Sequence, residues 1–123
     1  MTNEPSSKSS ARLPSGEHAI ISRDKITDYL LSASHPIGRF KAVFFFSLGY
    51  SINNWELLRQ DLLHLARSGE ALTVQQSPYG QKYEVRGSLV GPSGRRADLV
   101  TVWIVLDSET YPRLVTAYPG DEP

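Results

Sequence analysis

Hydrophobic residues change their spacing near the middle of the chain, from a helical period to a strand-like one. In the segment SRDKITDYLLS, Ile26, Tyr29 and Leu30 recur three and four positions apart. Ser22 and Asp24 precede them, and either residue can cap a helix. This spacing predicts a first helix whose apolar face turns toward a core.

Two further helices are expected in the first half of the chain. Pro36 is favoured at a first helical position and Gly49 follows the last apolar residue of that segment, so a second helix is predicted between them. A third helix is predicted in NNWELLRQDLLHLARSG, where leucines line one face and Gly69 ends the pattern. Asn53 and Glu56 have the spacing of a capping box at its start.

Four strands are expected in the second half. The segment KYEVRGSLV alternates polar and apolar residues, and RRADLVTVWIVLD is apolar on both faces in its second half, as a central strand would be. ALTVQQ is a candidate first strand and RLVTAY a last one, with turns at GPSG and SETYP. The expected fold class is therefore α+β, with N-terminal helices packed on one face of a C-terminal antiparallel four-stranded meander sheet.

Length and composition indicate one small domain. Residues 13–119 are expected to form a single α+β domain, which is long enough to bury one core. Residues 1–12 are rich in serine and poor in large apolar groups, which predicts a flexible tail, and residues 120–123 are expected to fray.

Charge and composition narrow the function classes. The 123 residues carry 13 lysines and arginines and 13 aspartates and glutamates, so no overall field attracts nucleic acid or an anionic membrane. The sequence has no cysteine, no apolar run long enough to span a membrane and no signal-peptide pattern, which fits a cytoplasmic protein without a membrane partner. His18, His35 and His64 lack metal-ligand spacing, so neither a metal nor another cofactor is expected.

Lys41 has an unusual position on the second predicted helix. At 100° per residue it falls inside a broad apolar arc, with Arg39 and Ala42 on the opposite side. The arc contains Ile37, Phe40, Val43, Phe44, Phe45 and Leu48. Lys41 either lays its methylenes on the neighbouring phenylalanines and reaches water, or points into a cleft to hold an anion or transfer a proton. In the second case we expect its side chain to be less than half exposed.

Other polar groups are candidates for the same site. His35 either caps the second helix or acts as a general acid or base at its N-terminus, where an anion is also favoured. Arg86 lies on the polar side of its strand, and Arg95 starts the next strand. Arg113 and Thr116 are three positions apart in the last strand, so simple alternation predicts that they lie on opposite faces of the sheet.

Three segments together resemble a known family. They are KITDYLLSASHPIGRFKAVFFFSLGY, YGQKYEVRGSLVGPSGRRADLVTVWIV and PRLVTAYP, and the resemblance covers roughly residues 13–119. The chain looks like a small bacterial domain family of unknown function, whose members occur alone or at the C-termini of large secreted toxin-like proteins. The order of helices and meander, closing on VTAYP, is also similar to the barnase–EndoU–colicin–RelE ribonuclease superfamily of bacterial toxins.

This resemblance implies a metal-independent RNA-cleaving toxin domain that a cognate antitoxin or immunity protein neutralises. In such toxins the 2′-hydroxyl of RNA attacks the adjacent phosphate. By position, His35 and Lys41 match the helical catalytic group, one as the base and the other as the donor to the 5′-oxygen. The matching sheet group, which stabilises the phosphate, is Arg86, Arg113 and Thr116. The implied substrate-binding residues are Arg39, Tyr83, Arg95 and Arg113.

Two other functions stay open at this point. A non-catalytic protein-interaction module, such as an antitoxin, an immunity protein or an adaptor, would use the apolar residues and the arginines as a binding face. The near-zero net charge and the lack of a decisive catalytic motif favour it. A binder of a small anionic ligand would use the cleft at Lys41 without turnover.

Overall fold

The structure is a computed structural model that describes residues 11–120, apart from the side chains of residues 73–75. The predicted tail therefore lies outside the described residues as far as residue 10, and the predicted frayed end lies outside them from residue 121 onward. Within the described part of the chain, no helix is long and apolar enough to cross a membrane.

The elements follow the order that the sequence predicts. The helical elements are η1 (Gly16–His18), α2 (Arg23–Lys25), η2 (Ile26–Leu30), α3 (Gly38–Ser47), η3 (Ile52–Asn54) and α4 (Trp55–Ser68). The strands are β1 (Glu70–Gln76), β2 (Gly80–Val90), β3 (Arg96–Leu106) and β4 (Pro112–Pro119). They form one antiparallel sheet in the order β1-β2-β3-β4. The predicted α+β class and the meander are confirmed.

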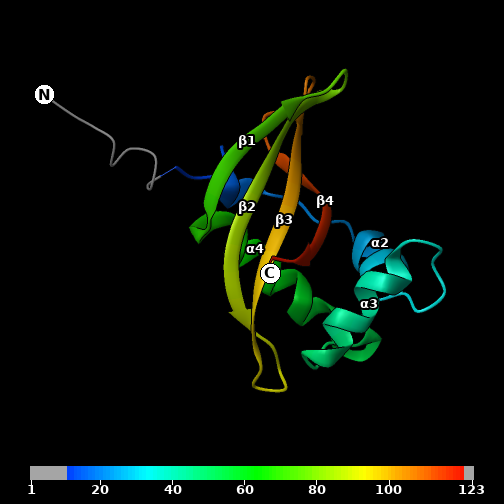
Figure 1. Ribbon diagram of the computed structural model, residues 1–123. Helices are drawn as coiled ribbons and strands as arrows, with labels where there is room; N and C mark the ends of the chain where they lie inside the picture. Colours follow the sequence, from blue (N-terminus) through cyan, green and yellow to red (C-terminus); the bar gives the residue numbers. More distant parts are fainter. Residues whose placement is uncertain (1–10, 121–123) are drawn as a thin grey trace, which may run out of the picture.

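The helices cover one face and one edge of the sheet. Helix α4 packs on β2 from behind, and α3 packs on η2 and on β4 at the edge of the sheet (Figure 1). The core lies between α4 and the sheet, where Leu58 and Leu62 are buried together with Val85 and Trp103. The face of the sheet away from α4 is called the open face below.

The first helix is regular at its start and widens at its end. Ser22 accepts a hydrogen bond from the Lys25 backbone N–H, as expected for the cap. Residues of η2 then form a π-helical turn, in which the Leu31 N–H donates to the Ile26 carbonyl at 2.9 Å. π-turns are rare, and they recur at functional sites.

The predicted buried face of α3 is right in part: Phe45 and Leu48 are buried and Phe44 is partly buried, but the other half of the predicted arc is exposed. Ile37, Phe40 and Val43 are exposed at 58%, 69% and 68%, whereas Ala42, expected on the polar side, is fully buried. The reason lies in a close approach: a Cβ at Gly38 would collide with the Tyr29 backbone carbonyl. Because a side chain does not fit at this contact, α3 turns Ile37, Phe40 and Val43 outward, while Phe45 and Leu48 keep their places in the core.

The start of α4 also differs from the prediction. The capping box is made by Ser51 and Asn54, not by Asn53 and Glu56. The Ser51 backbone N–H donates to the Asn54 side chain at 2.7 Å, and the Ser51 hydroxyl accepts from the Asn53 N–H at 3.2 Å. A short 3-10 turn at η3 precedes α4 and moves the cap two residues toward the N-terminus.

A bulge in β4 changes which residues share a face. Val102 pairs with Thr116 and Ile104 pairs with Arg113, with a register shift between these pairs. Paired residues of antiparallel strands point to the same side, so Thr116 and Arg113 both lie on the open face. The prediction of opposite faces is wrong because the extra residue, Val115, interrupts the alternation.

Candidate functional site

The candidate site is centred on Tyr29, in the π-helical turn η2. Its hydroxyl shares a hydrogen bond with Oγ1 of Thr116 in β4, at 3.2 Å. Both side chains are partly buried, so this polar contact lies where the helical half meets the edge of the sheet. The contact holds the Tyr29 side chain through its hydroxyl. The ring itself can therefore contact other groups.

Two lysine ammonium groups lie against the Tyr29 ring. Lys25 Nζ is 5.1 Å from the ring centroid and Lys41 Nζ is 5.8 Å from it, both within cation–π range. Lys25 precedes Tyr29 by four residues on the same helical run, whereas Lys41 comes from α3. Lys41 is partly buried, which confirms the expectation that it is less than half exposed.

His35 completes the group from the loop before α3. Its ring meets the Tyr29 ring edge to face, with centroids 5.0 Å apart. His35 Nδ1 accepts hydrogen bonds from the backbone N–H groups of Ile37 at 3.0 Å and Gly38 at 2.9 Å. These bonds cap α3 and assign the hydrogen of the neutral imidazole to Nε2. His35 therefore has the capping role that was considered from the sequence, and its role as a general acid or base stays a prediction.

These five residues, Lys25, Tyr29, His35, Lys41 and Thr116, are called the Tyr29 cluster. Over residues 11–120, no carboxylate lies within ion-pair distance of Lys25 or Lys41. Two ammonium groups without acidic partners give a locally positive site on a chain that is neutral overall. Such a site favours an anionic ligand, and hydroxyl and imidazole donors beside it can hold the oxygens of that ligand.

The close contact between α3 and η2 holds the cluster together. Gly38 and Ala42 are buried, and α3 packs directly on the backbone of η2 because of them. This contact brings Lys41, one residue before Ala42, to the Tyr29 ring. No group of three or more His, Asp or Glu side chains that could hold a metal ion occurs in the described range.

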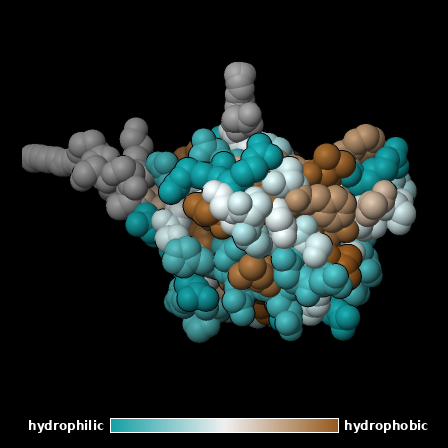
Figure 2. Space-filling view, turned by 90° about the horizontal axis from the view of Figure 1, so that it is seen from below, coloured by the Kyte–Doolittle hydropathy of each residue, from teal (hydrophilic) through white to brown (hydrophobic). Residues whose placement is uncertain are grey.

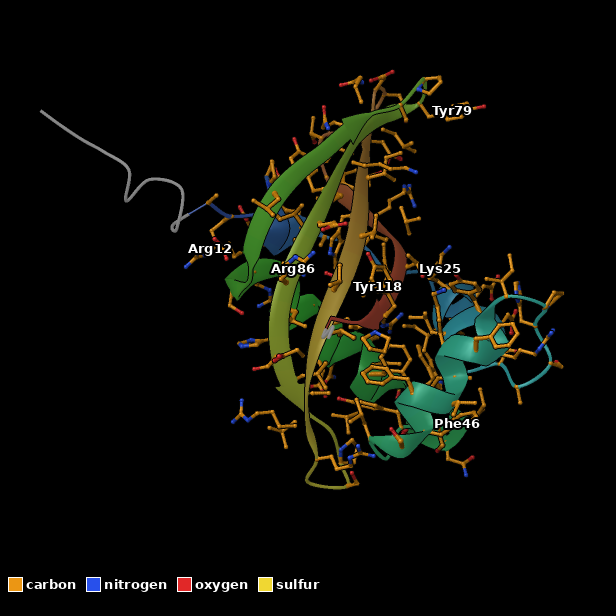
Figure 3. The ribbon with its side chains drawn as sticks, in the orientation of Figure 1. Arg12, Lys25, Phe46, Tyr79, Arg86 and Tyr118 are labelled. Carbon is orange, nitrogen blue, oxygen red and sulfur yellow. The ribbon has the colours of Figure 1, made fainter. Side chains whose placement is uncertain are left out.

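Arg86 lies on the open face at a distance from the cluster. Glu84 and Thr116 both pair with Val102 from opposite sides, so two strand spacings, about 10 Å, separate β2 from β4 here. Arg86 Nη2 contacts Glu84 Oε1 at 3.3 Å, and just over half of the Arg86 side chain is exposed. Figure 3 shows Arg86 and Tyr118 over the middle of the sheet, with Lys25 and Phe46 among the helices beside β4.

Tyr118 connects Arg86 with the cluster along the open face. It follows Thr116 on the same face of β4, and Val100 pairs with both Tyr118 and Arg86. Burial raises the pKa of Tyr118; the charge of Glu84 acts in the same direction, and the charge of Arg86 opposes it. A shallow hollow of about 280 Å³ lies beside this row, lined by Arg86, Gly87, Ser88, Asp98, Leu99, Val100 and Gly120.

The other predicted substrate-binding residues lie apart from the cluster. Arg113 shares the open face with Thr116, but it forms a two-pronged ion pair with Glu109, at 2.8 and 2.7 Å. Arg95 is exposed in the β2–β3 turn, and Arg39 is exposed above the Phe40 ring, at 4.5 Å from its centroid. Tyr83 packs against the core on the other face of the sheet.

Sequence reasoning missed Lys25 and Tyr29 as site residues. Tyr29 was assigned to the apolar face of its helix, and only its hydroxyl and ring electrons distinguish it from a core residue. One signal was available, because a lysine four residues before a tyrosine lies on the same side of a helix. The pairing with Thr116, by contrast, depends on the tertiary fold.

The chain belongs to the DUF6883 family. Residues 12–121 match the family model described as a domain of unknown function, DUF6883, which covers nearly the whole chain. No significant match to a curated protein was found.

The fold has a counterpart among solved structures. A chain in the "Contact-dependent growth inhibition toxin - immunity protein complex from Klebsiella pneumoniae 342" is similar to this one, with a TM-score of 0.65 and 19% sequence identity. The match covers 82% of this chain and 99% of that chain. At this identity the likeness shows a shared fold.

Proposed function

We propose that this DUF6883 chain is the metal-independent RNA-cleaving toxin domain of a bacterial toxin–immunity or toxin–antitoxin pair. The observation that carries the proposal is the convergence of Lys25, Lys41, His35 and Thr116 on Tyr29. The fold shared with a chain of a toxin–immunity complex supports it. The resemblance to the barnase–EndoU–colicin–RelE superfamily points to the same chemistry.

The cluster offers the groups that this reaction needs. The reaction is attack of a ribose 2′-hydroxyl on the adjacent phosphate, which requires a base, a donor to the 5′-oxygen and stabilisation of the phosphorane charge. The hydroxyls of Tyr29 and Thr116 would donate to a phosphate oxygen, and the Lys25 ammonium would neutralise charge. No bound metal is part of this scheme.

Two roles remain, the base and the donor to the 5′-oxygen, and the hydrogen bonds of His35 support one assignment of them. Its Nδ1 accepts from two backbone N–H groups, so the neutral ring donates from Nε2 and does not accept there. A proton on Nδ1 would displace both bonds and uncap α3. We therefore assign Lys41 as the base, and His35 Nε2–H as a hydrogen-bond donor to the leaving 5′-oxygen, which takes its proton from water.

The position of Arg86 implies a supporting role. With Arg86 two strands from Thr116, its guanidinium would meet a phosphate next to the scissile one. Its loss should then weaken RNA binding more than it slows the chemical step, and salt should modulate the effect.

The test is cleavage of single-stranded RNA by the purified protein in the presence of EDTA. We expect RNA to be cut and DNA of the same sequence to be spared. Lys41→Ala should slow cutting by about 100-fold or more, the usual scale for losing an acid–base group. Lys82→Ala, the matched control on β2, should change the rate by less than about threefold, because no residue of the cluster contacts Lys82.

A second readout is bacterial growth. Expression of the wild-type chain should arrest growth, and expression of Lys41→Ala should not. If the chain cuts no RNA and growth continues, the catalytic proposal is wrong. That outcome would favour the non-catalytic interaction module, for which the exposed apolar residues of α3 are the specific supporting observation.

A further inference from the structure

Helix α3 presents a row of apolar side chains to solvent. Ile37, Phe40, Val43 and Phe46 recur every three residues and are 58%, 69%, 68% and 40% exposed. These four residues are called the α3 strip. Seen from below, hydrophobic side chains gather on the right of the molecule, the side on which α3 lies in Figure 1 (Figure 2). Contiguous exposed apolar side chains of this size mark interaction sites on soluble proteins.

The strip is a consequence of how the site is built. Gly38 lies so close to the backbone carbonyl of Tyr29 in η2 that a side chain would not fit there, and the buried side of α3 continues through Ala42 and Phe45. Phe45 and Leu48 still enter the core, so the helix buries part of its apolar surface and leaves the four residues of the strip outside it. A chain that needed no partner here could carry polar residues at these positions at no cost to the η2 contact.

The charge of α3 restricts the partner. The helical segment GRFKAVFFFS contains two basic residues, Arg39 and Lys41, and no acidic one. The Arg39 guanidinium lies over the ring of Phe40 and is exposed, so a partner that covers Phe40 meets this charge as well. An apolar groove bordered by aspartate and glutamate side chains has the complementary surface.

The strip begins beside the candidate site. Ile37 is two residues from His35 and donates its backbone N–H to the His35 ring, and Phe40 adjoins Lys41 in sequence. The ten residues of α3 span about 15 Å, which is the length of helix that a groove receives in helix-in-groove recognition. An occupant of this length on the strip would therefore contact residues that adjoin His35 and Lys41 of the Tyr29 cluster.

We infer that the α3 strip is the docking surface for the neutralising protein of the pair, a protein with an acidic-rimmed apolar groove. This inference rests on the proposed function, because it identifies the partner that would block the site. Phe40 and Val43 are the central anchors and Arg39 provides a charged contact at the rim. Phe40 and Val43 themselves take no part in the reaction.

The test uses the protein encoded by the neighbouring reading frame as the probe. It is co-expressed with the tagged full chain, and the affinity of the purified pair is measured by calorimetry. The double variant Phe40→Asp, Val43→Asp should lose at least about 100-fold in affinity, as central anchors do. Arg39→Glu should lose about 10-fold, mostly at low salt. Tyr79→Asp, at an equally exposed aromatic far from α3, should bind as the wild type does (Figure 3).

A separate measurement checks that the double variant folds. Because the altered residues are exposed, we expect it to be stable. The melting temperature of the double variant should stay within a few degrees of the wild type. The variant should also still cut RNA, now without inhibition by the probe. Unchanged affinity of the double variant would overturn the docking inference, and so would failure of the wild-type pair to form.

The outcomes separate the two proposals. If RNA is cut but the probe still inhibits the double variant, the docking surface is wrong and the proposed function stands. If no RNA is cut but the double variant loses the probe, the docking surface stands and the ribonuclease activity is wrong. If the wild-type chain is a dimer that the double variant converts to a monomer, the occupant is a second copy and the inference is overturned.

Discussion

The hydroxyl of Tyr29 lies 3.2 Å from Oγ1 of Thr116 and joins the helical half of the chain to its last strand. The two residues are 87 positions apart in sequence. The candidate site therefore exists only where η2 is held against β4. Any change that separates these two elements should affect the site before it affects the core.

Tyr29→Phe tests this contact directly. The substitution keeps the ring that faces Lys25 and Lys41 but removes the hydroxyl, so Thr116 loses its partner. We expect the free energy of unfolding to fall by about 1 kcal/mol, the usual net value of one hydrogen bond. RNA cleavage should fall by about 10-fold or more, since the phosphate donor is lost and the ring is no longer held by Thr116. Chemical denaturation and a cleavage assay measure the two effects.

The control for this substitution is Tyr79→Phe. Tyr79 is exposed in the β1–β2 turn, and its hydroxyl lies far from the cluster (Figure 3). It should change neither stability nor rate. A Tyr29→Phe protein with wild-type activity would remove Tyr29 from the account of the site.

Gly38→Ala should destabilise the domain, although a glycine-to-alanine change within a helix usually stabilises a protein. Alanine normally stabilises a helix relative to glycine by up to about 1 kcal/mol. Here the added Cβ would collide with the backbone carbonyl of Tyr29, which cannot move aside as a side chain can. We expect a loss of about 1–3 kcal/mol, the cost of overpacking, as measured by urea unfolding. A protein stabilised by this change would show that α3 does not approach η2 so closely.

The sequence predicts the elements of the fold well but not how α3 is turned. Ser22, Gly49 and Gly69 mark helix ends through chemistry that is local to them, so these boundaries were predictable. The buried side of α3 was not, because it is chosen by the fit of Gly38 and Ala42 against a neighbouring backbone. A pattern weighted by hydrophobicity assigns Ile37, Phe40 and Val43 to the core together with Phe45, and the first three face solvent.

The site was predictable only where its residues have a local signal in the sequence. Lys41 and His35 are marked by their unusual positions in the sequence, and both reach the cluster. Thr116 was a candidate from its place in the last strand, but its face relative to Arg113 was predicted wrongly, because simple alternation does not include the bulge at Val115. The role of Tyr29 was not predictable, because its contacts with Thr116, His35 and Lys41 form only in the folded chain.

Tyr50 should make stability fall at alkaline pH. It is 1% exposed, and burial, together with its hydrogen bond to Asp61 and the charge of that carboxylate, raises its pKa well above the ordinary value. The unfolded chain releases this proton near pH 10, whereas the folded chain retains it. Above about pH 10 the folded state therefore binds more protons, and the free energy of unfolding decreases as pH rises.

Tyr50→Phe should flatten that dependence. It should cost about 1–2 kcal/mol at pH 8, where the hydrogen bond to Asp61 contributes in full. Between pH 9.5 and 11 its melting temperature should fall less steeply than that of the wild type. Tyr79→Phe should leave the slope unchanged. Equal slopes for Tyr50→Phe and the wild type would contradict the assignment of the alkaline effect to Tyr50.

The chemical nature of the RNA ends tests the central claim most directly. The measurement uses a synthetic RNA cut by the purified protein in EDTA, and a second RNA that carries a single 2′-deoxynucleotide on the 5′ side of the mapped cleavage position. Mass spectrometry of the first should give a 2′,3′-cyclic phosphate and a free 5′-hydroxyl, and the second should remain intact at that position. Equal cutting of both substrates, or a product with a 5′-phosphate, would show that the 2′-hydroxyl is not the nucleophile and would contradict the account.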